Sequence, residues 1–253
     1  MEYREFGKDR ENTVILLHGG GLCWWNYREA AKLLEDDFHV ILPVLDGHAG
    51  ADRPFVSIEE NALGIIEFMD RELGGHALFI GGLSLGGQIL LEMLARRRGI
   101  CSFALAESAS VIPSGLTARM TGPAVSCSYP LVKRKSFAQA QFSSLHINDG
   151  LFEDYWRDSR HIAKEDMISF IKASAGYRLD GRIGETEAKV FVRYGEKERR
   201  VIKKSTEKIK EAVPGCSIRA LTGMRHGEFS LNRPDLYAEE VRKIIQGGYR
   251  DLP

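Results

Sequence analysis

A single serine flanked by glycines follows a short apolar run. The apolar residues 76–80 lead into residues 82–86, which read G-L-S-L-G, and an amphipathic segment covers residues 88–98. This order predicts a strand, a tight turn and a helix, and the glycines let strand and helix pack closely. We therefore predict that Ser84 projects from a strained turn at the start of a helix, where a serine can act as a nucleophile.

The glycine pattern fits neither of two common nucleotide-binding loops. A phosphate-binding loop needs a lysine after its second glycine, but Gln88 follows Gly87. A dinucleotide-binding turn needs G-x-G-x-x-G, which neither residues 81–87 nor residues 19–21 supply. An ordinary glycine turn with a capping serine is the remaining alternative to a nucleophile.

A nucleophilic serine needs a general base, and the base needs an acid that fixes its tautomer. Of the 7 histidines, His226 alone lies in a loop between a C-terminal strand pattern and the last helix pattern. We expect His226 to be the general base. His18 directly precedes three glycines, and we expect it to form structural hydrogen bonds instead.

Strand and helix patterns alternate along most of the chain. The predicted strands are residues 3–6, 14–17, 39–45, 76–80, 102–106, 189–194 and 216–221. The predicted helices are residues 26–35, 58–73, 88–98, 202–212 and 234–246, the last followed by Gly247 and Gly248. Alternation of this kind predicts an α/β fold with a mostly parallel central sheet and helices on both faces.

The alternation stops between the fifth and sixth predicted strands. Residues 110–187 contain three prolines, a basic run and short helical patterns at residues 137–142, 152–160 and 167–175. A segment of this length is too long for a structureless loop, so we predict a helical lid. The predicted domains are a core of residues 1–109 and 188–253 and a lid of residues 110–187. Sites in parallel sheets lie beyond the carboxyl ends of the strands, which should bring Ser84 and His226 to one edge.

The composition is that of an ordinary soluble protein. The chain has 253 residues, 43% of them hydrophobic, with 35 basic and 35 acidic side chains. This balance gives no sign of nucleic acid or an anionic membrane as partner. The N-terminus lacks the apolar core of a signal peptide, and no run approaches the roughly 20 apolar residues of a membrane helix. The four cysteines are widely spaced, so we expect free thiols, no zinc site and a cytoplasmic location.

Five short motifs occur in the order typical of one family. They are H-G-G-G at residues 18–21, D-G-H at 46–48, G-L-S-L-G at 82–86, Y-G-E-K-E at 194–198 and G-M-R-H-G at 223–227. The chain resembles, over nearly its whole length, a lid-bearing α/β hydrolase of the serine esterase and lipase type. The resemblance also implies that His48 stabilises a loop and that Asp46 belongs to a structural turn.

The resemblance implies which groups complete the site. Glu198 stands where the family places its acid, with Glu196 and Glu107 as alternatives. The oxyanion hole is expected to consist of the backbone amides of Leu85 and Gly20, with Gly21 as an alternative to Gly20. Gly21, Leu22 and Trp24 are expected to contact the substrate, although Trp24 could equally pack beneath the lid.

These observations predict a serine hydrolase that cleaves an uncharged or weakly polar carboxylic ester through an acyl-enzyme, without a metal or organic cofactor. The same fold and triad also support cleavage of carbon–carbon, thioester, lactone or amide bonds. The H-G-G-G loop differs from the H-G-G-P-G of related iminopeptidases, which disfavours a peptidase. A slow-turnover receptor or interaction protein with the hydrolase fold is the alternative from another class. A monomer and a homodimer both fit the sequence.

Overall fold

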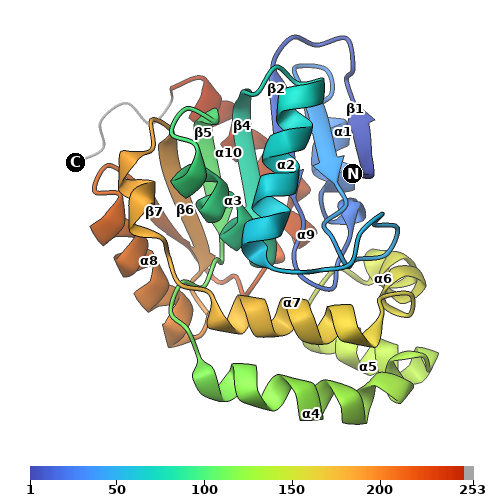
Figure 1. Cartoon of the computed structure of the whole chain (residues 1–253). Helices are drawn as coiled ribbons and strands as arrows, with labels where there is room; N and C mark the ends of the chain where they lie inside the picture. The colour runs from blue at the N-terminus through green and yellow to red at the C-terminus, as the bar shows by residue number, and fades with distance from the viewer. Residues whose placement is uncertain (248–253) are drawn as a thin grey trace.

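A seven-stranded sheet forms the centre of the protein in the computed structural model, which describes residues 1–247 (Figure 1). The strands are β1 (Tyr3–Phe6), β2 (Thr13–Leu17), β3 (His39–Pro43), β4 (Ala77–Leu83), β5 (Cys101–Glu107), β6 (Lys189–Gly195) and β7 (Ser217–Leu221). Their spatial order is β1-β3-β2-β4-β5-β6-β7. Only β1 pairs antiparallel, so the predicted mostly parallel sheet is confirmed.

Helices cover both faces of the sheet. The helices α2 (Ile58–Glu72), α3 (Leu85–Arg96) and α8 (Arg200–Ala212) lie in front in Figure 1, and α1 (Arg28–Leu34) and α10 (Pro234–Ile245) lie behind. Because successive side chains of a strand point to opposite faces, Ile15 and Leu17 join one hydrophobic cluster and Val14 and Leu16 join the other. Fully apolar strands are therefore what a sheet covered on both faces requires.

Two short elements complete the core. The 3₁₀ helix η1 (Trp24–Tyr27) precedes α1, and α9 (Glu228–Asn232) precedes α10. The final helix ends at Ile245, close to the prediction, and Gly248 lies outside the described residues. None of the helices in residues 1–247 combines the length and apolar character needed to cross a membrane.

A helical insertion separates β5 from β6. It contains α4 (Gly115–Val132), α5 (Lys135–Ser144), η2 (Asp149–Leu151), α6 (Phe152–Ser159), α7 (Lys164–Gly176) and η3 (Gly181–Glu185). In Figure 1, α7 lies along the lower edge of the sheet and α4 lies below α7. The three helical patterns expected in this segment fall on α5, α6 and α7.

Helix α4 was not anticipated, because Pro123 and Pro130 lie inside it. A proline removes one helical hydrogen bond and usually breaks or kinks a helix. Both prolines are exposed, and so are Arg119 and Ser126, whose carbonyl groups lose the bonds. Water can hydrogen-bond these exposed carbonyls, so the cost of the two prolines stays limited.

Candidate active site

Ser84 occupies a strained turn between β4 and α3. Its backbone has φ 51° and ψ −107°, a conformation that residues other than glycine rarely adopt. The Ser84 N–H donates to the carbonyl oxygen of Glu107 at 2.8 Å, which ties the turn to β5. A Cβ on Gly82 would lie 2.4 Å from the Gly86 oxygen, and one on Gly86 would lie 2.1 Å from the Leu17 oxygen. The two glycines are therefore required by the close packing of this turn.

Glu198 and His226 come together from the loops after β6 and β7. The His226 Nδ1 atom lies 2.8 Å from Oε2 of Glu198. The Glu198 side chain is 1% exposed, whereas the imidazole is 49% exposed. Oε1 of Glu198 accepts hydrogen bonds from the Ser108 hydroxyl at 2.5 Å and the Gly195 N–H at 3.0 Å. Three donors thus hold this carboxylate in place.

The ionisation of Glu198 follows from these contacts. Burial alone would raise the pKa of Glu198, but the hydrogen bond and charge of His226, together with the bonds from Ser108 and Gly195, bring the pKa below its ordinary value. A carboxylate only accepts hydrogen bonds, so Nδ1 of His226 must carry the proton. Nε2 is then the acceptor nitrogen, as a general base requires.

The two other glutamates considered as the acid do not hydrogen-bond His226. Glu196 is exposed, and its Oε2 accepts from the Gly223 N–H at 2.9 Å. Glu107 is buried; its Oε1 accepts from the Ser230 N–H at 3.3 Å, and its Oε2 has no partner in the described structure. Burial raises the pKa of Glu107 to about 7. Glu198 is therefore the carboxylate that the structure pairs with His226.

Some backbone N–H groups of the glycine loop and of the start of α3 have a hydrogen-bond acceptor, and others do not. The Gly19 N–H donates to Oδ1 of Asn26 at 3.1 Å, and the Gly21 N–H donates to Nε2 of His48 at 3.0 Å. Neither the N–H of Gly20 nor that of Leu85, the first residue of α3, has an acceptor among residues 1–247. Gly20 and Leu85 are thus the amides free to hold an oxyanion, and Gly21 is not.

Two buried histidines hold this loop from behind. Nδ1 of His48 donates to the Asp46 carbonyl at 3.0 Å, which leaves Nε2 to accept from Gly21. Nδ1 of His18 donates to the Gly19 carbonyl at 2.9 Å, and its Nε2 accepts from the Leu45 N–H at 3.1 Å. Burial lowers the pKa of His48 to about 4 and that of His18 well below its ordinary value, so both rings are neutral. Their hydrogen bonds agree with the structural roles expected for them.

A cavity of about 680 Å³ contains Ser84, His226 and Gly20. Its wall combines residues of the core with residues of the insertion. The apolar part of the wall includes Leu22, Leu83, Ile112, Leu145, Ile147, Phe170, Ile171 and Leu231. Helix α4 contributes Ser114 and Thr117. The positions from the insertion were not predicted, because helical periodicity does not tell which face of α4 or α7 meets the core.

Of the three residues expected to contact substrate, only Leu22 lines this cavity. Gly21 is not among its lining residues, and its N–H is held by His48. Trp24 does not line it either, and its ring instead lies 5.6 and 5.8 Å from the guanidinium carbons of Arg4 and Arg28. The structure therefore does not support Gly21 or Trp24 as substrate contacts.

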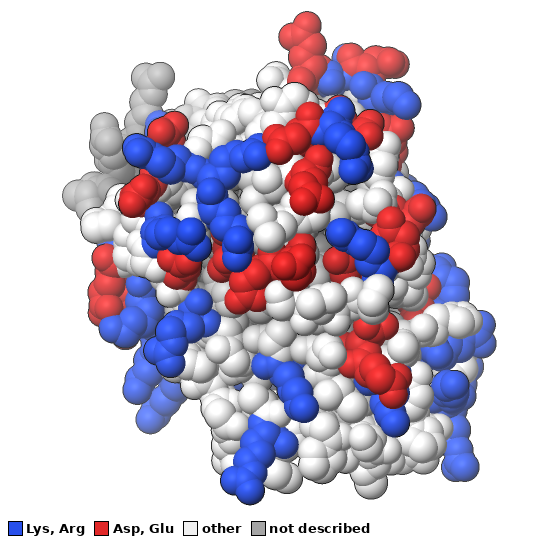
Figure 2. Space-filling view, in the orientation of Figure 1, with Lys and Arg blue, Asp and Glu red and all other residues white. Residues whose placement is uncertain are grey.

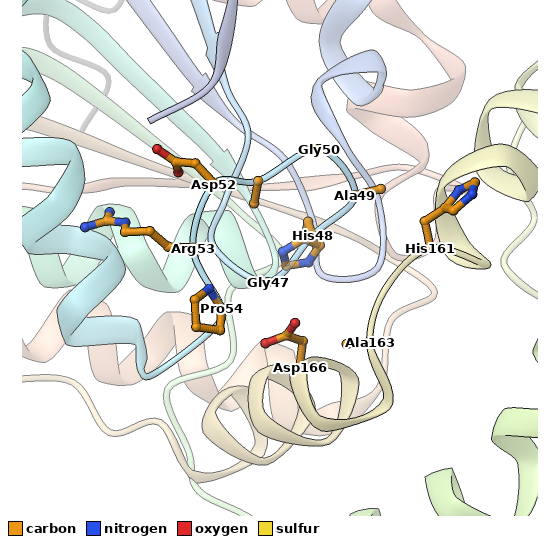
Figure 3. Close-up of a pocket in the computed structure, with 11 residues that line it drawn as sticks. Gly47, His48, Ala49, Gly50, Asp52, Arg53, Pro54, His161, Ala163 and Asp166 are labelled. Atoms are coloured by element: carbon orange, nitrogen blue, oxygen red, sulfur yellow. The ribbon is translucent and has the colours of Figure 1, made fainter.

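A second cavity of about 300 Å³ lies between the loop after β3 and the insertion (Figure 3). In Figure 3, Asp166 of α7 faces the loop that carries Gly47 and Pro54. Oδ1 of Asp166 accepts the Phe55 N–H at 2.8 Å, which fastens the insertion to the core. This cavity contains none of Ser84, Glu198 and His226. Over residues 1–247, no group of three or more His, Cys, Asp or Glu side chains is arranged to hold a metal ion.

Comparison with known proteins places the chain in a family. Residues 14–240 match the sequence model of the Alpha/beta hydrolase family, and the chain belongs to that family. A curated relative, an uncharacterized hydrolase of Saccharomyces cerevisiae, is 28% identical over 127 residues, which are 48% of this chain and 42% of that protein. The match thus spans less than half the length of this relative.

Solved structures share the fold over nearly the whole chain. An esterase from Thermogutta terrifontis has a TM-score of 0.79 at 16% identity, covering 97% of this chain and 93% of that chain. An enol-lactonase from Burkholderia xenovorans LB400 has a TM-score of 0.78 at 15% identity, covering 97% and 96%. The likeness in each case is one of fold.

Proposed function

We propose that the protein is a serine hydrolase that cleaves a small-molecule carboxylic ester through an acyl-enzyme intermediate. The observation that carries the proposal is the 2.8 Å hydrogen bond between His226 and a buried, ionised Glu198, on the wall of the cavity that contains Ser84. The apolar side chains around these groups suit an uncharged acyl or alcohol group, which agrees with the substrate class expected from the sequence.

The reaction proceeds in two halves. In the first, Oγ of Ser84 attacks the carbonyl carbon while Nε2 of His226 takes the serine proton. The N–H groups of Gly20 and Leu85 hold the oxyanion, and Glu198 stabilises the imidazolium. The imidazolium then protonates the departing alcohol as the ester C–O bond breaks. In the second half, water gives a proton to His226 and attacks the acyl-enzyme, which releases the acid and restores the Ser84 hydroxyl.

Hydrolysis of p-nitrophenyl esters of increasing acyl length tests the proposal. We expect Ser84→Ala to lower kcat/KM by about 10³-fold or more, because the nucleophile is lost. Ser110→Ala is the matched control, since Ser110 lines the same cavity without belonging to the turn, and it should stay within about tenfold of wild type. Equal rates for wild type and Ser84→Ala would overturn the mechanism.

Labelling of Ser84 combined with turnover measurements distinguishes the alternative functions. Labelling of Ser84 by a fluorophosphonate with almost no steady-state turnover would favour the slow-turnover receptor. Labelling together with cleavage of a thioester, a lactone, an amide or a carbon–carbon bond, but of no ester, would retain the nucleophile and replace the substrate class.

A further inference from the structure

Helix α4 exposes a continuous apolar stripe. The described chain has six exposed large hydrophobic side chains, and three of them are on α4: Leu116, Met120 and Leu131, which are 75%, 53% and 37% exposed. At 3.6 residues per turn they share one face with other exposed apolar residues. The whole stripe is Leu116, Met120, Pro123, Ala124, Cys127, Pro130 and Leu131. The buried residues of α4, Thr121, Val125 and Val132, lie on its opposite side.

The charged residues on α4 and directly after it in the sequence are all basic. Between Glu107 and Asp149 the sequence contains no acidic residue but four basic ones, Arg119 and the run Lys133-Arg134-Lys135. Lys135 pairs with Glu153 at 2.6 Å, whereas Arg119, Lys133 and Arg134 form no ion pair with any acid in residues 1–247. In Figure 2 the lower rim of the molecule, where α4 lies in Figure 1, is white and blue without red. The balanced total charge therefore conceals a local excess of positive charge.

We propose that the outer face of α4 docks on an anionic lipid surface. Apolar side chains in a stripe can enter the boundary between head groups and acyl chains, while basic residues at the edge and end of the helix contact lipid phosphates. A second copy of the chain fits less well, because a pairing of two such faces would oppose like charges. The proposal departs from the expectation, drawn from the total charge, that no membrane is a partner.

The docking surface and the large cavity share one helix. Ser114 caps α4 and Thr117 lies in its first turn, and both line the cavity that contains Ser84. A lipid surface bound to the outer face of α4 would therefore lie on the far side of the cavity wall. Binding itself does not depend on the proposed catalysis, so the two proposals can fail separately.

Co-sedimentation with vesicles tests the docking. We expect wild type to bind phosphatidylcholine vesicles that contain phosphatidylglycerol, to bind pure phosphatidylcholine weakly, and to dissociate at high salt. The double substitution Leu116→Ser and Met120→Ser should weaken binding about tenfold or more. The matched control is Leu33→Ser with Val56→Ser, which removes two exposed apolar side chains elsewhere and should bind like wild type.

A second pair of variants tests the charges. Lys133→Gln with Arg134→Gln should weaken binding to anionic vesicles, whereas Arg10→Gln with Lys189→Gln, two exposed side chains at the amino ends of the strands, should not. No binding by wild type, or equal binding by the α4 variants and their controls, would overturn the proposal. Concentration-dependent dimerisation that Leu116→Ser with Met120→Ser abolishes, without vesicle binding, would assign the face to a second copy instead.

Discussion

Two buried glutamates near the candidate site differ because their hydrogen-bond partners differ. Glu198 accepts from His226, Ser108 and the Gly195 N–H, and these donors keep its pKa below the ordinary value despite burial. Glu107 has one long bond from the Ser230 N–H, and burial raises its pKa to about 7. The number of donors, rather than depth, decides which carboxyl group carries a charge.

Glu198→Gln tests directly whether Glu198 is the acid that orients His226. A glutamine amide can donate to Nδ1 of His226, which would favour the tautomer with the proton on Nε2. We expect kcat/KM for an ester to fall by about 10³- to 10⁴-fold while the fold is retained. The control is Glu196→Gln, whose exposed side chain accepts only from the Gly223 N–H, and its rate should stay close to wild type. Activity of Glu198→Gln within tenfold of wild type would exclude Glu198 as the acid.

Glycine spacing and the order of the strands nominated Ser84 and His226, whereas the family resemblance nominated Glu198, with Glu196 and Glu107 as alternatives. Ser84, Glu198 and His226 each follow a strand whose carboxyl end lies at one edge of the sheet. Ser108 and Asn26 could not be nominated. Their roles depend on which backbone and carboxylate groups the folded chain brings within reach, and no local pattern records such contacts.

The turn around Ser84 shows how tightly one element constrains its neighbours. Gly86, the second residue of α3, lies against the backbone of β2, and the missing side chain is what permits this approach. The strained serine persists because β2, β5 and α3 all hold the turn.

Gly86→Ala should therefore be severely destabilising. Its new Cβ would lie 2.1 Å from the Leu17 oxygen, so backbone must move, and we expect a loss of about 3 kcal/mol or more in the free energy of unfolding. Gly176→Ala is the control, since nothing lies within 4 Å of a Cβ there. Its free energy of unfolding should change by less than about 1 kcal/mol. Urea denaturation of both variants measures the difference, and similar losses would contradict this account of the turn.

The elements themselves were predictable to different degrees. The central strands β2, β3 and β4 are short, mainly apolar runs, which is the signal a doubly covered sheet produces, whereas the edge strands β1 and β7 mix apolar with charged residues. Helix α4 was missed because Pro123 and Pro130 argue against a helix, and only the structure shows that both face outward. The wall of the large cavity was missed for a related reason, since it depends on how α4 and α7 rotate against the core.

For the molecule as a whole, two buried titratable groups change the free energy of unfolding with pH in opposite directions. The pKa of His48 falls from 6.5 to about 4, so between these values only the unfolded chain gains a proton, and stability decreases as pH falls. The pKa of Glu107 rises from 4.5 to about 7, so over that range only the unfolded chain loses a proton, and stability decreases as pH rises.

Glu107→Gln should remove the decrease in stability with rising pH that Glu107 causes. Relative to wild type, the variant should gain about 2.5 kcal/mol in the free energy of unfolding between pH 5 and pH 8, because the wild-type carboxyl group resists ionisation in the fold. Urea denaturation of both proteins at the two pH values measures this gain. A difference between the proteins that stays constant with pH would show that Glu107 ionises normally.

The order of the strands also determines which parts of the candidate site come early and which come late in the chain. From β5 onward, each strand of the sheet pairs with the strand that precedes it in the chain, and the helical insertion comes between β5 and β6. The Ser84 turn needs only β2, β4, β5 and α3, whereas the His226–Glu198 contact needs the loops after β6 and β7. Glu198 and His226 therefore both come from the last part of the chain to be synthesised. A chain truncated before β6 would contain the residues of the Ser84 turn but neither the proposed acid nor the proposed base.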